Sequence, residues 1–451
     1  MIFTKSRGIP LCVASLLLAA SSSTTAADKN NVIPVDESIA ARIEKAHTAR
    51  VIIPRFILQA QRSGSEANYQ VQVREAMPAV TSTTTTSVRG GNSRYVDEDD
   101  IATMLVSDEP DVFALIAVEK NGGKKANGIV QRDAEKIKIT QNGSGAKTMA
   151  TIAGAFNPPP LRCGYRPDTE GRSLFEDGHD DHDHSAHDHH QDHSHDFDPS
   201  KTDDALADLK HSLRGSELHI GKRRRAQGVG YDYHVDVYVE IDFALCAANG
   251  ETCAEGIGTK TLNYVNALFT GANTIYETEI NTHLHVLHID LNTNYDSSTD
   301  SGMALDTMQT KFGSSAGWHY TSPSGVKPDL HHALLGKGLG GGIAFLGVIC
   351  DSELGFGLTS GLKGNFVSMD NVVVWDSSAF MHEIGHNFGS GHTHDDYSPV
   401  IDTCGTSCPT GLPLAKSTTI MSYCDLCTGG DSNLAYTFGG NIKALVFAVI
   451  L

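Results

Sequence analysis

The stretch HEIGHNFGSGH, residues 382–392, combines a helical spacing of histidines with a turn signal. On a helix, side chains four residues apart lie on the same side, so His382 and His386 point in one direction. Gly389 readily adopts the positive φ that ends a helix, and the turn lets His392 approach from elsewhere. Three neutral imidazoles then occupy three corners of a tetrahedron around Zn²⁺ and leave the fourth for water. The stretch therefore predicts a helix, a turn and a site for one zinc ion.

Glu383 directly follows the first of these histidines, so its carboxylate lies beside the metal and does not point at it. In that place it takes the proton of a zinc-bound water and later delivers it to a leaving amine. The zinc lowers the pKa of this water towards about 7 and polarises the scissile carbonyl. A helix with plain surface histidines is the alternative, and it does not explain Glu383, Gly389 and His392 together. The pattern predicts amide hydrolysis.

A second motif, TIMSYC at residues 419–424, follows HEIGHNFGSGH in the chain. HEIGHNFGSGH with IMSY resembles the metzincin clan of zinc endopeptidases, and the chain is most similar to its reprolysin (adamalysin, M12B-like) group. The resemblance covers roughly residues 231 to 440. It implies an α/β catalytic domain with a mostly parallel twisted sheet, an active-site helix and a cleft, in which Met421 forms a turn beneath the zinc ligands.

The stretch GGGIAFLGVIC, residues 340–350, is similar to the substrate-binding edge strand of that group. By itself it predicts a strand that glycines introduce. The resemblance implies that protein or peptide substrates bind along Gly342, Ile343, Ala344, Phe345, Leu346 and Gly347.

Two departures leave the metzincin subgroup open. Thr393 follows the third histidine, where reprolysins usually carry aspartate. Tyr423 matches the Met-x-Tyr arrangement of astacin-like and serralysin-like members, whose tyrosine ligates zinc or stabilises the oxyanion. The alternative for Tyr423 is an aromatic ring packed beside Cys424, and both interpretations stay open.

Hydrophobic periodicity predicts alternating strands and helices in this domain. YHVDVYVEID at 233–242 alternates apolar and polar residues as a strand does, and residues 283–290 read as another strand. Apolar residues recur at helical spacing over 260–280 and again from Met303 to Phe312. Such alternation favours an α/β sandwich around a central sheet. Residues 28–175, in contrast, contain strand-like runs broken by polar turns and predict a separate, β-rich prodomain.

The stretch PPPLRCGYRPD, at the end of this prodomain, resembles the cysteine switch of metzincin zymogens at residues 160–168. A thiolate is a good zinc ligand, so Cys163 would fill the fourth zinc position in the zymogen in place of water. Arg162 and Arg166 favour the thiolate or anchor the segment to acidic residues of the cleft. A stray thiol is the alternative.

Residues 176–225 read as a linker that ends in a processing site. Eight histidines and eight aspartates fill 176–198 without hydrophobic periodicity, which is typical of a solvated linker, with loose metal binding as the alternative. KRRR at 222–225 predicts cleavage by a processing protease after Arg225, which would release a catalytic domain of residues 226–451. Since the family usually has a further helix after the Met-turn, a complete and a C-terminally truncated domain both stay open.

Residues 1–27 combine a basic start, an apolar core and small residues before Asp28, as secretory signal peptides do. The chain has no other apolar run long enough for a stable membrane anchor. Seven cysteines between Cys246 and Cys427 then predict disulfides, and the resemblance implies that Cys350 is the one left over.

Charge excludes two classes of partner. The chain carries 35 Lys and Arg against 54 Asp and Glu, a net charge of −19, and residues 226–451 contain no arginine at all. Nucleic acids and anionic membranes both attract cationic surfaces, so neither is an expected partner. The sequence thus predicts a secreted zinc endopeptidase made as a zymogen. The rival is a non-enzymatic metal-binding or adhesive secreted protein, against which Glu383 argues, because a binding module needs ligands but no base.

Overall fold

The computed structural model describes residues 33–34, 56–61, 68–109, 112–118, 126–132, 135–141, 147–151, 164–166, 233–364, 372–405, 407–408, 418–428 and 433–439. The expected signal peptide at 1–27 and the linker at 176–225, including Arg225, lie outside the described residues. Cys163 also lies outside them, although the backbone of the next three residues is described.

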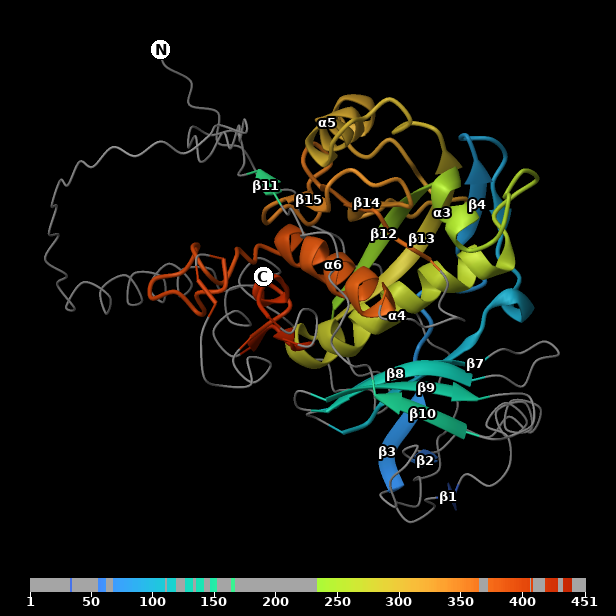
Figure 1. Ribbon diagram of the computed structural model, residues 1–451. Coiled ribbons are helices and arrows are strands. Elements are labelled where there is room, and N and C mark those ends of the chain that lie inside the picture. Colours follow the sequence, from blue (N-terminus) through green and yellow to red (C-terminus); the bar gives the residue numbers. More distant parts are fainter. Residues whose placement is uncertain are drawn as a thin grey trace, which may run out of the picture. The chain divides into compact units, whose positions relative to one another are not determined.

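One eight-stranded sheet is built from the N-terminal third of the chain (Figure 1). Its strands pair antiparallel, apart from the parallel contact of the first two. Short connections and alternating strand-like runs favour such a meander. In sheet order the strands are β1 (Ile33–Pro34), β2 (Phe56–Gln61), β3 (Asn68–Glu75), β6 (Thr103–Ser107), β7 (Val112–Val118), β8 (Ala126–Arg132), β9 (Glu135–Gln141) and β10 (Lys147–Thr151).

A second eight-stranded sheet holds most strands of the C-terminal half and is mixed. Its central neighbours run parallel, whereas β15 runs antiparallel to β16, and β5 antiparallel to β4. Parallel pairing joins β16, β14, β12, β13 and β4, and the sheet as a whole is mixed. In sheet order the strands are β11 (Gly164–Arg166), β15 (Gly342–Phe345), β16 (Phe356–Ser360), β14 (Leu330–Leu335), β12 (Tyr233–Asp242), β13 (Thr282–Asn292), β4 (Thr85–Val88) and β5 (Arg94–Tyr95).

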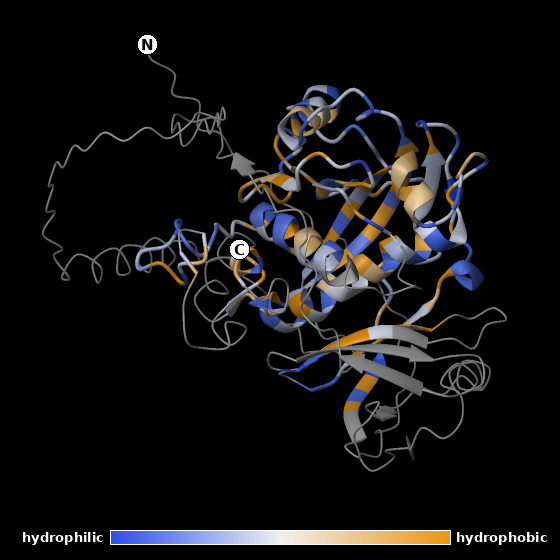
Figure 2. Ribbon diagram, in the orientation of Figure 1, coloured by the Kyte–Doolittle hydropathy of each residue, from blue (hydrophilic) through white to orange (hydrophobic). Residues whose placement is uncertain are grey.

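Helices cover both faces of this second sheet. On β14, Leu330 and Leu334 belong to one apolar core and Ala333 and Leu335 to another, as alternation along a strand requires. The first core includes apolar residues of α4 and α6, which contact each other, and the second those of α5. Figure 2 shows the hydrophobic residues that β12 and β13 bring to this arrangement. The described helices are η1 (Glu98–Asp100), α3 (Phe243–Ala248), α4 (Thr259–Ile280), α5 (Ser301–Phe312), α6 (Val372–Asn387) and η4 (Cys424–Leu426).

The expectation of a separate prodomain is wrong for part of the N-terminal segment. Strand β4 lies parallel to β13 and continues the C-terminal sheet beyond it. The hydroxyl of Thr84 donates to the backbone oxygen of Val286, and the Val80 amide donates to the side chain of Asn266 on α4. An uncovered β13 would present a row of unpaired backbone groups, and β4 satisfies them. Leu115 and Val80 share the apolar core of α4 and the sheet.

Three disulfides link described cysteines: Cys246–Cys253, Cys404–Cys424 and Cys408–Cys427. Cys350 is also disulfide-bonded, so the expectation that it is left over is wrong. No helix among the described residues has the length and apolar character needed to cross a bilayer.

Candidate active site

Helix α6 carries the decisive stretch. It ends at Asn387, and Gly389 follows with a φ of 91°, which confirms the predicted glycine turn. Asp376 and Ser377 have residue types that often cap the start of a helix, but they lie inside α6. The Asp376 carboxylate accepts hydrogen bonds from the hydroxyl of Tyr264 and from backbone amides of the loop before the helix.

The structure brings the three predicted histidines together. His382 and His386 lie on α6, and the turn returns His392 to them. The ring centroid of His386 lies 4.7 Å from each of the other two, which are 5.4 Å apart. One nitrogen of each ring lies within 4.8 Å of the others, and all three residues are buried.

Backbone carbonyls orient two of the imidazoles. The Nδ1 atom of His382 lies 2.8 Å from the oxygen of Ile420, and that of His386 lies 2.6 Å from the oxygen of Ser390. A carbonyl only accepts, so each Nδ1 carries the proton and each Nε2 keeps its lone pair. The Nε2 atom of His382 is buried without a hydrogen-bond partner. Metal-binding histidines use this arrangement, in which one nitrogen is fixed and the other faces the ion.

Burial also keeps these rings neutral. It lowers the pKa of His382 to about 4, although the hydrogen bond to Ile420 opposes the change. It also lowers the pKa of His386 and that of His392, which neighbouring histidines lower further. A neutral imidazole is the form that binds a metal ion. Three neutral nitrogen donors, one of them without a partner, therefore fit Zn²⁺.

Glu383 lies against the first residue of β15. A Cβ atom added to Gly342 would lie 2.3 Å from Oε1 of Glu383, closer than atoms approach each other. The glycine thus leaves room for the carboxylate beside β15. Glu383 is fully buried, as expected for a base that works away from bulk water.

Strand β15 spans Gly342–Phe345, Leu346 and Gly347 follow it, and β11 lies beyond it in the sheet. The side-chain amide of Asn387 donates to the backbone oxygens of Phe345 and Phe356 and so ties α6 to β15 and β16. The Gly347 amide donates to the oxygen of His386, 2.9 Å away. The strand and the helix are therefore held in one register.

The other side of β15 pairs in parallel with β11, residues 164–166. Gly164 lies opposite Ile343, and Arg166 opposite Phe345. The backbone that directly follows Cys163 thus lies beside the strand along which the resemblance places the substrate. The position of Cys163 itself is not among the described residues.

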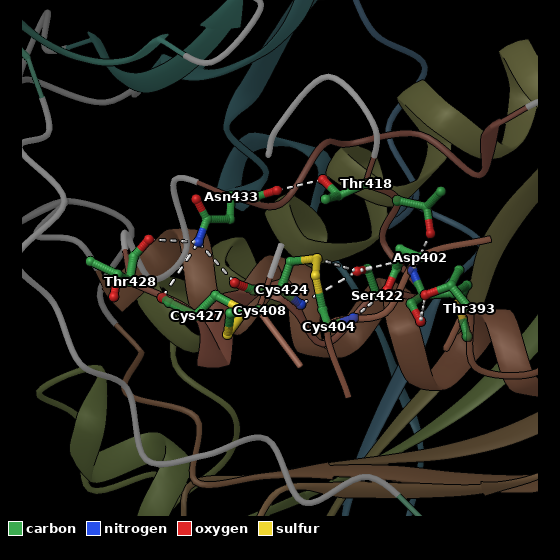
Figure 3. Close-up of a disulfide and its surroundings, with 12 residues drawn as sticks. Thr393, Asp402, Cys404, Cys408, Thr418, Ser422, Cys424, Cys427, Thr428 and Asn433 are labelled. Carbon is green, nitrogen blue, oxygen red and sulfur yellow. Dashed lines mark hydrogen bonds between the residues drawn. A yellow bond between two sulfur atoms is a disulfide. The ribbon is translucent and has the colours of Figure 1, made fainter. Parts of the chain in front are cut away.

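Met421 packs beneath the helix between two of the histidines. A Cβ added to Gly385 would lie 2.5 Å from the Met421 sulfur, so this turn of α6 needs glycine. The Met421 oxygen accepts from the hydroxyl and the amide of Thr393. Figure 3 shows the Cys404–Cys424 bond beside Ser422 and near Thr393, where it ties the turn to the segment after α6.

Tyr423 follows this turn and reaches the histidines. Its hydroxyl lies 3.1 Å from Nε2 of His392, and its ring centroid lies 4.7 Å from that of His392. The ring also lies 4.8 Å from that of His394. The hydroxyl thus lies beside the histidine nitrogens, a place from which it can donate to a bound oxygen.

Residues 262–393 match a protein-family model described as "Metallo-peptidase family M12B Reprolysin-like". The match supports a metallopeptidase. It covers α4, β15 and the three histidines, that is, the part of the chain in which the site is built.

The other comparisons add no argument about function. No curated protein matches the chain. A solved structure titled "Structure of a chaperone-substrate complex" aligns with 37% of this chain at 13% identity and a TM-score of 0.25. The alignment spans 25% of that structure's chain, and so low a score carries no conclusion about the fold.

Sequence reasoning missed three positions that shape the site. Asn387 fixes the edge strand, Gly385 admits Met421, and His394 lies beside Tyr423. The first two stand inside the quoted zinc stretch, but only the packing of β15 and the turn against α6 gives them these roles.

Proposed function

We propose that the protein is a zinc-dependent endopeptidase that hydrolyses internal peptide bonds of proteins, with one catalytic zinc held by His382, His386 and His392. The observation that carries the proposal is the convergence of three buried, neutral imidazoles beside the Glu383 carboxylate and strand β15. The family match over residues 262–393 supports the same class of enzyme.

Each residue has a separate task in this proposal. When bound, the zinc supplies a Lewis acid and lowers the pKa of water. Glu383 accepts the proton of the attacking water and passes it to the leaving amine. Backbone groups of β15 bind the substrate as an added strand, because that geometry offers alternating donors and acceptors. The Tyr423 hydroxyl donates to the oxyanion as it forms.

The base is tested by Glu383→Ala. The alanine variant should lose at least about 10³-fold in kcat/KM on a peptide library and keep its zinc, because Glu383 transfers protons but holds no metal. Zinc is measured by mass spectrometry and cut sites by peptide sequencing. Glu353→Ala is the matched control, since Glu353 is exposed, and it should keep both zinc and activity. Near wild-type turnover in Glu383→Ala would contradict the assignment and leave the non-enzymatic alternative.

We propose further that the chain is secreted as a zymogen and activated by a processing protease that cuts after Arg225. The signal-like residues 1–27 and the basic cluster at 222–225 support this. The pairing of β11 with β15 supports it as well, because a chain segment on the edge strand excludes substrate from it. Within this proposal, the Cys163 thiolate holds the fourth zinc position until cleavage.

The thiol is tested in a precursor whose cleavage site is blocked by replacing Arg223, Arg224 and Arg225. Cys163→Ala should raise peptide turnover of this precursor, because the zinc then regains water. Cys163→Ser serves as the near-isosteric comparison. Cys350 provides the competing arrangement, because it is disulfide-bonded. A Cys163–Cys350 peptide in the non-reduced digest, with equal rates in both precursors, would remove the switch.

A further inference from the structure

A second group of metal-binding side chains lies at the start of β12 and β13. In this parallel pair Asp236 lies opposite His285, and His234 lies opposite His283. Alternate residues of a strand share one face, so these four side chains lie together on one face of the sheet. Val235 and Val237 face the apolar core on the other side. The register of two neighbouring strands therefore creates the group.

Three of these side chains converge on one point. Oδ1 of Asp236 lies 3.1 Å from Nε2 of His234 and 2.7 Å from Nδ1 of His285. All three atoms lie within 4.8 Å of one another. Tetrahedral zinc, with bonds of about 2.0–2.1 Å, separates its ligand atoms by roughly 3.4 Å. Small rotations of the side chains would bring the three atoms to these distances.

The surroundings favour a bound cation. The side chains are 18%, 8% and 12% exposed for His234, Asp236 and His285, so the site is sheltered but open to entry. The Asp236 carboxylate is the acidic member of the group. Asp329 adds a second carboxylate, which accepts from the Asp236 amide.

The remaining nitrogen of His285 is oriented as in known metal sites. Its Nε2 atom lies 3.3 Å from the hydroxyl of Thr81 and 3.4 Å from that of Thr83. Metal-binding histidines commonly fix the other ring nitrogen in this way. His283 is a neighbour and not a ligand, because it does not belong to the group of side chains whose ligand atoms lie within 4.8 Å of one another.

We propose that His234, Asp236 and His285 bind a second transition-metal ion, of the zinc class, outside the α6 site. Two imidazoles and one carboxylate suit Zn²⁺, whereas Ca²⁺ and Mg²⁺ prefer oxygen ligands throughout. The ion joins β12 to β13 and, through Thr81 and Thr83, the turn before β4. Its role is structural, since it connects β12, β13 and the turn before β4, which are distant from one another in the chain.

The test counts zinc in the full chain carrying Glu383→Ala, which prevents self-digestion. After dialysis with zinc and removal of the excess, mass spectrometry gives the zinc content per chain. His285→Gln should bind one zinc fewer than its parent, and His234→Gln should do the same. His283→Gln is the matched control and should bind as many as the parent. Because the variants are compared with one parent, zinc held by the histidine-rich residues 176–198 cancels.

A second measurement covers variants that fold poorly. Added zinc should raise the thermal midpoint of the parent and of His283→Gln by several degrees more than that of His234→Gln or His285→Gln. An unchanged zinc content and an equal thermal shift in both ligand variants would overturn the proposal.

Variants of the two zinc sites test the two proposals separately. His386→Ala in the same background should also lose one zinc, and the double variant with His285→Gln should lose two. If only His386→Ala loses zinc, the site on β12 and β13 is refuted and the proposed catalytic zinc stands. If only His285→Gln loses zinc, the reverse holds.

Discussion

Gly342 and Glu383 meet at the point where β15 touches α6. Gly342→Ala should place a methyl group where the Glu383 carboxylate lies, since the added Cβ would be 2.3 Å from its Oε1 atom. The carboxylate must move, and a displacement of about 1 Å costs on the order of 10²-fold in rate. We expect kcat/KM to fall by that amount with zinc content unchanged, as measured by peptide turnover and mass spectrometry.

Gly338→Ala is the matched control for this prediction. A Cβ at Gly338 would meet no atom within 4 Å, so the variant should keep wild-type kcat/KM. Equal activity in both alanine variants would mean that Glu383 has room to move, and the glycine would then have no positioning role.

The sequence predicted the chemical roles of individual residues more completely than the contacts that hold those residues in place. The spacing of His382, His386 and His392 follows from helix geometry and one glycine turn, both local properties. The carbonyl of Ile420, which fixes the His382 tautomer, lies 38 residues further along the chain. Such a partner has no signal of its own in the sequence, because any residue type offers the same carbonyl.

At the scale of elements, β14 carries a buried histidine whose protonation opposes folding. Burial and, less strongly, neighbouring His331 lower the pKa of His332 to about 3. The folded state thus binds this proton less well than the unfolded chain, whose pKa is near 6.5. The contribution of neutral His332 to stability is present above pH 6.5 and is lost as the pH falls from 6.5 towards 3.

His332→Gln should therefore make the free energy of unfolding less dependent on pH in this window, by up to about 1.4 kcal/mol per pH unit. Denaturant unfolding at several pH values between 4 and 8 gives the slope. Thr359→Val is the control, because it removes the partner that lies 3.0 Å from Nε2 of His332 but keeps the imidazole, so its slope should match the wild type. A glutamine variant with the wild-type slope would contradict the prediction.

Periodicity located most elements of the C-terminal half. The helical patterns at 260–280 and Met303–Phe312 correspond to α4 at Thr259–Ile280 and α5 at Ser301–Phe312, and the alternation at 233–242 corresponds to β12. Residue type does not locate the start of α6, because Asp376 has the residue type of a cap but accepts hydrogen bonds from Tyr264 and the preceding loop. Residue type alone cannot distinguish a cap from a buried acceptor.

At the scale of the whole molecule, the N-terminal segment completes the fold of the C-terminal half. Residues 226–451 produced alone should unfold at a lower temperature than the full chain, because they lack β4 beside β13 and expose apolar residues of α4. After cleavage at Arg225, the two pieces should elute together in gel filtration under native conditions, because β4 still pairs with β13 even when β11 leaves β15. Thermal unfolding of the isolated piece against the cleaved complex measures the difference.

The control for this comparison is the full chain cleaved and then tested without separation. It should keep the thermal midpoint of the uncut chain, since the cut lies outside the described strands. An isolated 226–451 piece with an unchanged midpoint would mean that β4 adds nothing to the stability of β13.

The sequence by itself determined the local chemistry: a helix with histidines four apart, a base beside them, a glycine turn and a glycine-introduced strand. These features depend on residues close together in the chain, whose geometry follows from backbone periodicity. Only the tertiary structure decided that β4 extends the C-terminal sheet, that Met421 packs against Gly385, and that His234 and Asp236 meet His285. Each of these contacts joins segments that are distant in the chain, and what selects them is the packing of whole faces and edges, which no short stretch encodes.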